Sequence, residues 1–536
     1  MESDHFTHIY HYITFLVGYI PVLLYVSIGP IIGVLILWCL VDFVGIGKPK
    51  RIPGLPQVPG LPIVGNLHQL SHNPSLVYSK WAKIHGDVYQ TRMGSRKVVV
   101  ANSYDSIMEL WMQNWHNNNS RPTLFTFHNV VSKTQGLTIG TTPYCDSYKR
   151  KRKFVATNLN KTAVGKYSDL ISLESIHTLE RIDKFLSDKE NAPHRDINLL
   201  KFVQAYHLKI ALFITYGYAI DYNTEYGLSL LDEVTSVENK ITRLRSHTSN
   251  PQDYIPILKF LAPKLNTPNE FRRRRDKYIR FFEDQLKTRL EHGEDVECFV
   301  SQAWKIMDED PKRLSPEELQ SACLTLVSAG LDNAPLNFFY CIGMLSNSEF
   351  GYEIQNTAVF ELLKEYGSLE NAWEMCVYEN LKVDYICALI KETLRHMTVL
   401  PLSLPRETTS PIEYRGCTIP KGTILFMNAA AANNDPKYYP HPEKFEPKRW
   451  LSDDLTLDPK AKLCQFSFGI GSRMCAGSHL AYKELYVLLV RTIIKYKIRE
   501  PHNLNLRMKT NPFELNECPD SIAIEPENFL VKLLPR

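Results

Sequence analysis

The chain has 536 residues, 44% of them hydrophobic and 22% charged, and its 62 basic and 58 acidic residues leave a formal net charge of +4. This balance excludes disorder as the overall class, because disordered chains combine few apolar residues with a high net charge, and it gives no support to a nucleic-acid footprint. The 11 cysteines include no CxxC pair, which argues against a zinc ribbon or a disulfide scaffold and favours a reducing compartment.

The first predicted element is a membrane anchor. Between Ile13 and Val41 the chain carries no charged residue, and this run exceeds the roughly 20 residues that cross a hydrocarbon core. Acidic residues precede the run and basic residues follow it from Lys48, so the positive-inside rule places the rest of the chain in the cytosol. A secretory signal would begin with basic residues, and a buried soluble helix rarely extends past about 14 apolar residues. We therefore expect residues 1–47 to form the anchor, with a transmembrane helix at 13–41.

Residues 48–64 are predicted to form a stiff hinge. Prolines recur at every third position, at Pro53, Pro56, Pro59 and Pro62, and they fix φ without donating hydrogen bonds. The remaining residues, 65–536, contain no internal repeat, so one catalytic domain is the simplest interpretation.

The pattern of this domain predicts a mainly α fold with a small β portion. Most of residues 165–400 reads as long helical stretches, whereas residues 88–103 alternate around a Gly-Ser turn and predict a hairpin. A second small cluster of strands is expected at 412–428, again with Gly and Pro at the turns.

The helical region includes a long helix with an unusual middle. Ser315, Pro316 and Glu318 fit the N-cap, N1 and N3 positions of a capping box. Asp332 lies in an apolar run, where burial would be costly without a purpose, and Pro335 removes a helical hydrogen bond beside it. A widened groove with an acid is expected there, suited to oxygen binding and proton relay.

The chemistry-bearing segment of the last third surrounds Cys475. An irregular stretch punctuated by Gly469 and Gly471 precedes it and an apolar-periodic helix follows, so the thiol lies near a helix N-terminus, which favours the metal-binding thiolate. The glycines would let the backbone pass close to a flat cofactor, and Arg473 could reach an anionic group. A lone buried cysteine is more often an inert small hydrophobe, so the surrounding residues decide the interpretation.

Those residues carry a resemblance. Residues 468–477, FGIGSRMCAG, match every fixed position of the haem-binding loop of the cytochrome P-450 haem-thiolate monooxygenases. Residues 391–395, KETLR, resemble the ExxR motif of that family, and residues 445–450, FEPKRW, resemble its FxPxRW segment. The anchor and hinge are also similar to those of microsomal members. The resemblance therefore implies the cytochrome P-450 fold behind an N-terminal transmembrane helix, on the cytosolic side of the endoplasmic reticulum membrane.

The resemblance also implies a haem b whose iron is ligated by Cys475. The other implied cofactor-binding residues are Arg473, Arg406, Arg152, Tyr148, Phe468, Gly471 and Gly477. The arginines would meet the haem propionates, and Tyr148 stands where the family usually has tryptophan. Glu392 and Arg395 share one helix face and are expected to engage Arg449 in a buried structural network, the alternative being an ordinary surface ion pair.

On the distal side, Ala329, Gly330 and Asp332 match the AGxDT motif, but Asn333 replaces its threonine. We expect Asp332 and Asn333 to be catalytic. Asparagine can hydrogen-bond dioxygen or water but lacks a hydroxyl to pass on a proton, so delivery would depend more on ordered water.

The implied reaction is insertion of one oxygen atom of O2 into an organic substrate. The chain has no Walker or GxGxxG motif for a flavin or nicotinamide, so electrons are expected from NADPH through a separate NADPH-cytochrome P-450 reductase. The basic run at 149–153 is a candidate docking face for that acidic partner, or else a solvated helix face. The run at 272–275 is expected to be a solvated face.

Several stretches, among them PGLPIVGNLHQL and SRPTLFTFHNVVSKTQGLTIGTTP, resemble fungal phenylacetate hydroxylases. The substrate expected is phenylacetate or a hydroxyphenylacetate, hydroxylated on the ring. Arg121, His128 and Lys133 are candidates to bind its carboxylate, or else ordinary loop residues, and candidate pocket walls are Val399, Leu400, Leu402 and Ser403. Two alternatives stay open: a haem-thiolate enzyme that couples or isomerises another aromatic or tyrosine-derived substrate, and a non-enzymatic haem-binding membrane sensor.

Overall fold

The computed structural model describes residues 49–536 except 71, 135, 189, 191, 193, 247, 262–265 and 459–463, together with six separate residues between 29 and 40. The predicted anchor at 13–41 therefore lies almost entirely outside the described residues. Within the described part of the chain, no helix combines the length and the apolar character that crossing a membrane requires.

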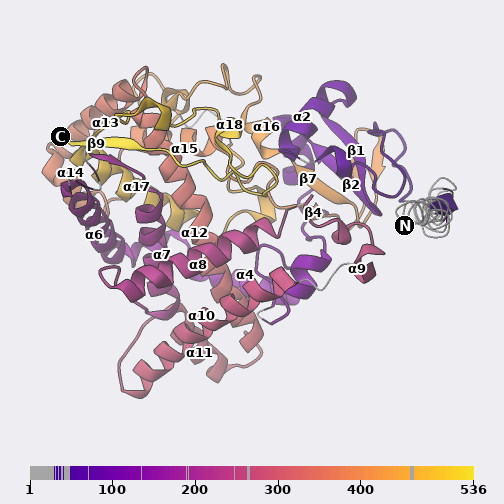
Figure 1. The fold of residues 1–536 in the computed structure, drawn as a ribbon, viewed down its shortest axis with the longest axis horizontal. Coiled ribbons are helices and arrows are strands. Elements are labelled where there is room, and N and C mark those ends of the chain that lie inside the picture. The colour runs from indigo at the N-terminus through magenta and orange to yellow at the C-terminus, as the bar shows by residue number, and fades with distance from the viewer. Residues whose placement is uncertain are drawn as a thin grey trace, which may run out of the picture.

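The described residues form a mainly helical fold with small sheets, as predicted (Figure 1). The helices are α2 (Pro74–His85), α3 (Tyr104–Ile107), α4 (Asp146–Asn158), α5 (Lys161–Gly165), α6 (Ser168–Ser187), α7 (Leu200–Tyr216), α8 (Glu225–Arg243), α9 (Leu258–Leu261), α10 (Asn266–Glu291), α11 (Phe299–Glu309), α12 (Pro316–Ser346), α13 (Gly351–Tyr366), α14 (Leu369–Met375), α15 (Asp384–His396), α16 (Ala429–Asn433), α17 (Ser478–Lys495) and α18 (Pro512–Leu515). Two π-helical segments, η2 (Met108–Gln113) and η3 (Phe125–Val131), interrupt the region between α3 and α4.

Three small sheets complete the fold. The first has the strand order β1 (Val88–Met93), β2 (Arg96–Ala101), β7 (Ile424–Met427) and β4 (Arg406–Glu407). The second has the order β3 (Asp196–Ile197), β9 (Val531–Pro535) and β8 (Tyr496–Arg499), and the third pairs β5 (Ile412–Tyr414) with β6 (Cys417–Ile419). The hairpin predicted at 88–103 and the strand cluster predicted at 412–428 are confirmed.

The first sheet joins distant parts of the chain. β1 and β2 are antiparallel around a turn at Gly94, whose φ of +55° lies in the left-handed region that glycine adopts most readily. β2 then pairs in parallel with β7, more than 300 residues later, with Val98 opposite Ile424. This sheet and α2 form the β-rich side of the molecule in Figure 1, opposite most of the helices.

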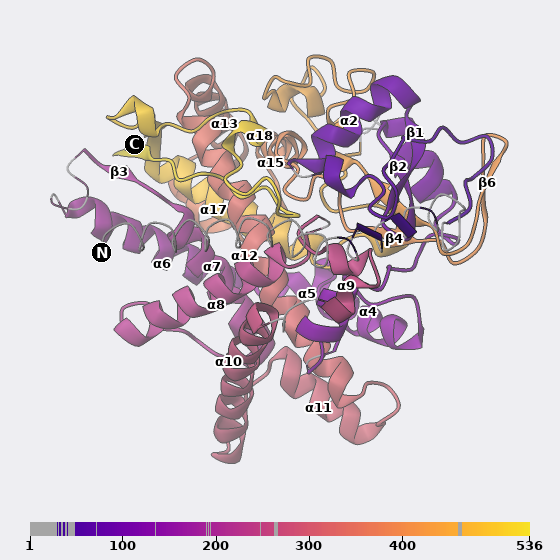
Figure 2. The ribbon, with the colours of Figure 1, turned by 45° about the vertical axis from the view of Figure 1, so that its right-hand side comes forward.

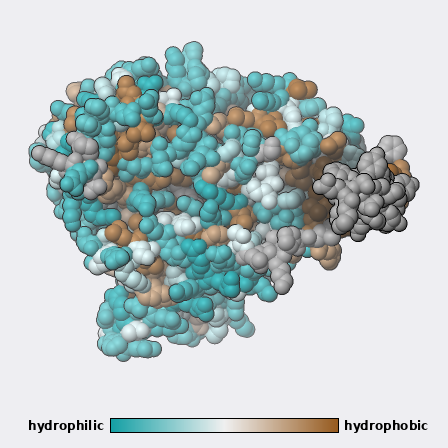
Figure 3. Space-filling view, in the orientation of Figure 1, coloured by the Kyte–Doolittle hydropathy of each residue, from teal (hydrophilic) through white to brown (hydrophobic). Residues whose placement is uncertain are grey.

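Helix α12 lies at the centre of the helical part, while α10 and α11 project from one end (Figure 2). It begins as predicted, because the Ser315 side chain accepts a hydrogen bond from the Glu318 N–H and Pro316 occupies the first turn. The largest apolar cluster joins its second half to α7, α15 and α17. The face shown in Figure 3 is mostly hydrophilic, with hydrophobic side chains in scattered patches.

Candidate active site

The loop before α17 carries the candidate haem ligand, Cys475. A single 3-10 turn, η6 (Gly471–Arg473), precedes it, and Gly477 is the N-cap of α17, so the thiol lies at a helix N-terminus as predicted. The Cys475 N–H donates to the Phe468 carbonyl at 2.9 Å, which folds the loop back on itself. Gly471 has a φ of +70°, and a Cβ there would approach the Trp111 carbonyl oxygen to 3.1 Å, so this position needs glycine.

The Cys475 side chain has protein packed closely around it, but one side of it is exposed. Burial raises its pKa, whereas a hydrogen bond from the Gly477 N–H and the charge of Arg152 act in the opposite direction. The side chain nevertheless has an open side, because part of it is exposed. A thiol held by backbone on one side and open on the other can serve as the axial ligand of a cofactor.

The middle of α12 shows a similar opening. Ala329 is exposed and Gly330 half-buried, although Val327 and Leu331 beside them are fully buried. A Cβ on Gly330 would meet only the Ala211 Cβ, at 3.9 Å. This face of a central helix therefore borders open space that a flat cofactor and a small substrate can fill.

Four arginines gather around the cysteine loop. Arg406 donates from Nη1 to Asn118 Oδ1 at 2.7 Å and from Nη2 to the carbonyl of Ile470. Arg473 donates from Nη2 to the carbonyl of Thr142. Arg121 donates to the carbonyls of residues 140, 404 and 405 at 2.6–2.8 Å. The fourth is Arg152, on α4, and we call the four the arginine cluster.

The arginine cluster concentrates positive charge in a largely buried region. Burial, and then the charge of Arg473, lower the pKa of Arg406 to about 9. Burial also lowers the pKa of Arg121, and the charges of Arg473, Arg406 and Arg152 lower it further. Among the described residues, none of the four forms an ion pair with a carboxylate, and Nε and Nη1 of the buried Arg473 have no hydrogen-bond partner. Buried charges of this kind need counterions, and the two propionates of haem fit the cluster.

Tyr148 packs against the arginine cluster. Its ring lies 3.7 Å from the guanidinium carbon of Arg473, a cation–π contact. Its hydroxyl donates to the Ser472 carbonyl at 3.3 Å. Tyr148 therefore supports Arg473 through ring stacking and fastens α4 to the cysteine loop.

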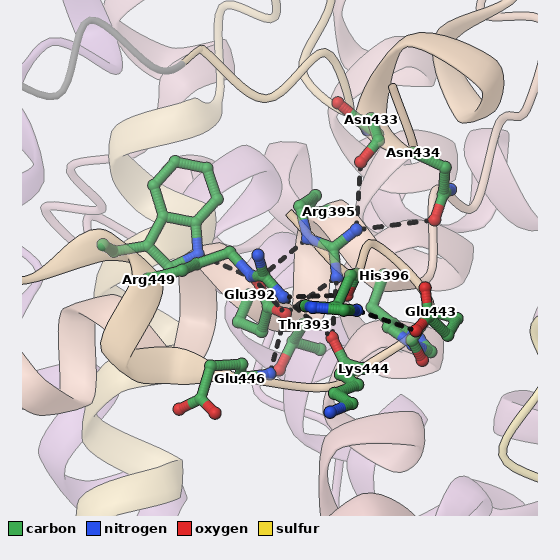
Figure 4. A network of polar contacts seen from close by, with 12 residues as sticks. Glu392, Thr393, Arg395, His396, Asn433, Asn434, Glu443, Lys444, Glu446 and Arg449 are labelled. Atoms are coloured by element: carbon green, nitrogen blue, oxygen red, sulfur yellow. Dashed lines mark hydrogen bonds and ion pairs between the residues drawn. The ribbon is translucent and has the colours of Figure 1, made fainter. Parts of the chain in front are cut away.

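The predicted network of Glu392, Arg395 and Arg449 is present and buried (Figure 4). Arg395 donates from Nε and Nη2 to the two Glu392 oxygens at 2.9 and 2.8 Å, and Arg449 donates from Nε to Glu392 Oε1 at 3.0 Å. Burial alone would raise the pKa of Glu392, but the hydrogen bond and charge of Arg395 and the charge of Arg449 outweigh it, so the pKa is lowered.

Two further donors to Glu392 complete the network. The Trp450 indole N–H donates to Oε2 at 3.0 Å, and the Glu446 N–H donates to Oε1 at 2.9 Å. Arg395 also donates to the carbonyls of Asn433 and Lys444, so it joins α15 to the end of α16 and to the segment before η5 (Pro447–Trp450). The alternative of a surface ion pair is therefore wrong.

On the distal side, α12 runs unbroken through Pro335. Asn333 is half-buried, and the Asn337 side-chain amide donates to its carbonyl at 2.7 Å. Oδ1 of the buried Asn337 has no partner among the described residues. The side chain of Asp332 lies outside the described residues.

Two expectations about basic runs are wrong in part. Lys151 is buried, and its Nζ donates to Thr142 Oγ1 at 2.8 Å and to the Leu137 carbonyl at 2.9 Å, so the run at 149–153 is not a continuous surface. Arg275 is also buried and donates to the Val131 carbonyl at 2.9 Å, so the run at 272–275 is not simply a solvated face. Each of these two helices buries one cation because carbonyl oxygens of η3 and of the loop after it accept hydrogen bonds from that cation.

A pocket lies beside the arginine cluster, between η3, the turn after α8 and the segment before β4. Its lining residues are Arg121, Pro122, Leu124, Phe127, His128, Gly140, Thr141, Arg245, Leu404, Pro405 and Ile522. Of the predicted carboxylate ligands, Arg121 and His128 line it, whereas Lys133 is exposed and does not. The predicted walls at 399–403 stop one residue short of it. Arg245 was missed because no motif surrounds it in the sequence.

Comparison with known proteins agrees with this geometry. The Cytochrome P450 family model matches residues 55–532. Phenylacetate 2-hydroxylase of Emericella nidulans is 42% identical over 94% of this chain and 95% of its own length. 3-Hydroxyphenylacetate 6-hydroxylase of the same organism is 36% identical over 91% of this chain and 90% of its own. Cytochrome P450 monooxygenase CYP3 of Mycosarcoma maydis is 32% identical over 91% and 88%. The chain belongs to the cytochrome P450 family of monooxygenases.

Proposed function

We propose that the protein hydroxylates the aromatic ring of phenylacetate or a hydroxyphenylacetate, using haem bound at the cysteine loop. The observation that carries the haem site is the arginine cluster beside Cys475, whose charge no described carboxylate balances. The substrate class rests on the extent of similarity to two relatives named for arylacetates, which covers at least nine-tenths of the chain.

Cys475 would ligate the haem iron, and Arg473, Arg406 and Arg152 would meet the propionates. Phe468, Gly471 and Gly477 shape the loop around the sulfur, and Arg121 joins the propionate partners because its charge couples to theirs. When bound, a haem with a thiolate ligand supplies the activation of dioxygen and the insertion of one oxygen atom into the substrate.

The chain's own residues position the substrate and move protons. Asn333 offers an amide that can hydrogen-bond water. It occupies the position of the threonine in the family motif, so we assign it to proton delivery together with Asp332. Because asparagine has no hydroxyl, the proton passes through water held at this amide. The apolar side chains that line part of the pocket give the aromatic ring of the substrate a hydrophobic contact surface.

The names of the two relatives share a regiochemistry. Hydroxylation at position 2 of phenylacetate and at position 6 of 3-hydroxyphenylacetate both place oxygen on a ring carbon next to the one that bears the acetate group. We propose the same ortho selectivity here, since an enzyme that fixes the acetate presents the same ring edge to the oxidant in either substrate.

The electrons come from NADPH through a separate NADPH-cytochrome P450 reductase. We also propose that residues 13–41 anchor the chain in the endoplasmic reticulum membrane with one span, with residues 48–64 as the hinge and residues 65–536 as the catalytic domain in the cytosol. The uninterrupted apolar run and the basic residues after it support this arrangement.

The test is a turnover assay of the full-length chain with its reductase, NADPH and isotopically labelled dioxygen. An ortho-hydroxylated acid that carries one labelled oxygen supports the proposal. A coupled or isomerised product without label points to the alternative haem-thiolate chemistries, whereas haem that the reductase cannot reduce points to a sensor. NADPH consumption that yields only peroxide removes the arylacetate assignment.

A further inference from the structure

We propose that Arg245 binds the carboxylate of the substrate in the pocket beside the arginine cluster. This inference rests on the proposed function, because it requires an aromatic acid as substrate. It adds the residue that distinguishes such an acid from a neutral aromatic compound of the same shape.

The pocket is apolar apart from its cations. Leu124, Phe127, Leu404 and Ile522 provide hydrophobic walls that suit an aromatic ring. Two arginines and one histidine also line it, and no aspartate or glutamate occurs among the described residues that line it. A wall of this composition favours a small aromatic anion over an aromatic cation.

Arg245 is placed for this role by local structure and by stacking. It lies in the turn directly after α8, where its N–H donates to the Thr242 carbonyl at 3.0 Å. Its guanidinium carbon is 4.5 Å from the centre of the Phe127 ring. Stacking uses the face of a guanidinium group, whereas a carboxylate is bound through N–H groups at its edge, so both interactions can coexist.

The other two basic residues of the pocket, Arg121 and His128, form hydrogen bonds with backbone carbonyls. Arg121 donates to three backbone carbonyls and couples electrostatically to the arginine cluster. His128 has its ring nitrogens 3.0 Å from the Leu124 carbonyl and 3.2 Å from the Thr141 carbonyl. Burial lowers the pKa of His128, and the hydrogen bonds to the Thr141 and Leu124 carbonyls offset only part of this effect. Arg245, which lines the pocket and stacks on Phe127, is the charged group that we assign to the substrate carboxylate.

The pocket adjoins the haem site that we propose. Leu404 and Pro405 line it, and the next residue, Arg406, donates to the Ile470 carbonyl in the cysteine loop. Thr141 lines it too, and the next residue, Thr142, accepts a hydrogen bond from Arg473. A carboxylate held at Arg245 thus keeps its ring against walls that the pocket shares with the haem site.

The test compares phenylacetate with phenylacetamide, a neutral compound of nearly the same shape. Dissociation constants are measured from the change that each compound causes in the haem absorption spectrum, and KM and kcat are measured for each. The variants are Arg245→Gln, Arg245→Lys and Lys240→Gln, a control that removes the same charge from an exposed position of α8.

We expect Arg245→Gln to raise the dissociation constant and KM for phenylacetate at least about tenfold, and to change those for phenylacetamide much less. Arg245→Lys should recover part of the affinity for the acid, and Lys240→Gln should behave as the unmodified protein does. The haem content of each variant, read from its carbon monoxide difference spectrum, is measured in parallel.

Equal losses for the acid and the amide would overturn the inference, as would loss of haem in both Arg245 variants, which would make Arg245 a partner of a propionate or a structural residue. If Arg245→Gln binds phenylacetate as the unmodified protein does, the inference fails and the proposed function stands. If the unmodified protein neither binds nor oxidises phenylacetate, the proposed function fails, and the inference fails with it.

Discussion

Arg395 holds both carboxylate oxygens of Glu392, at 2.9 and 2.8 Å, and neither side chain is exposed. A pair of this kind is costly to break, because removing one partner leaves the other as a buried charge. Its three-residue spacing also occurs on the surface, where Lys382 and Glu379 pair at 2.9 Å with about a third of each side chain exposed. The molecule therefore contains one buried and one exposed ion pair with the same spacing, whose contributions to stability can be compared.

We expect Arg395→Leu to lower the free energy of unfolding by about 3–5 kcal/mol, because Glu392 is left with fewer compensating donors. The surface control, Lys382→Ala, should cost about 0–1 kcal/mol. Urea unfolding of the detergent-solubilised protein measures both. A loss for Arg395→Leu no larger than that for the control would show that the remaining donors, Arg449 and Trp450, suffice.

The arginine cluster predicts a change in haem retention. Arg406→Gln removes one buried cation, and we expect the rate of haem transfer to an excess of an apoprotein scavenger to rise by about tenfold or more. Arg507, exposed at 61%, supplies the control Arg507→Gln, which should leave that rate unchanged. If Arg406→Gln retains haem as the control does, then Arg406 does not contact a propionate.

Local patterns in the sequence predicted the parts of the fold that depend on neighbours in the chain. Three such features depend only on residues close together in the sequence: the capping box at Ser315, the hairpin around Gly94 and the position of Cys475 before α17. The Glu392 network was also predicted, but from the resemblance of residues 391–395 and 445–450 to family motifs together with the cysteine loop, because a three-residue spacing alone occurs by chance in most proteins.

The sequence did not predict which charged residues are buried. Lys151 and Arg275 lie in basic runs that suggest solvent, but carbonyls of segments 14 and 144 residues away accept their hydrogen bonds. Arg245 lines the pocket only because the turn after α8 packs on Phe127. Such placements follow from tertiary packing, and no short motif encodes them.

Buried Lys151 predicts a dependence of stability on pH. Desolvation lowers its pKa from 10.5 to about 8, so between these values the unfolded chain binds more protons than the folded chain. Stability contributed through this group is therefore lowest below about pH 8 and rises as the pH increases toward 10.5, by at most about 3 kcal/mol.

The measurement is the free energy of unfolding of the unmodified protein minus that of Lys151→Met, at several pH values across this window. We expect the difference to rise in favour of the unmodified protein as the pH increases. The subtraction removes the titration of tyrosines and other groups common to both proteins. A flat or falling difference would mean that Lys151 is solvated well enough to keep its ordinary pKa.

Asn333 predicts how efficiently electrons are used for product. Its amide can hold a water molecule but cannot itself relay a proton as a hydroxyl does, so Asn333→Ala should lower the ratio of hydroxylated product to NADPH consumed, with more peroxide formed. Asn333→Thr restores a hydroxyl and should keep that ratio at or above the value of the unmodified protein. Substrate affinity should change little in either variant, because the pocket lining does not include this residue.

Leu326, a half-buried residue two turns earlier on α12, gives the control Leu326→Ala, which alters the same helix without touching an amide. If Asn333→Ala couples NADPH to product as well as the unmodified protein and this control do, proton delivery does not pass through the side chain of Asn333.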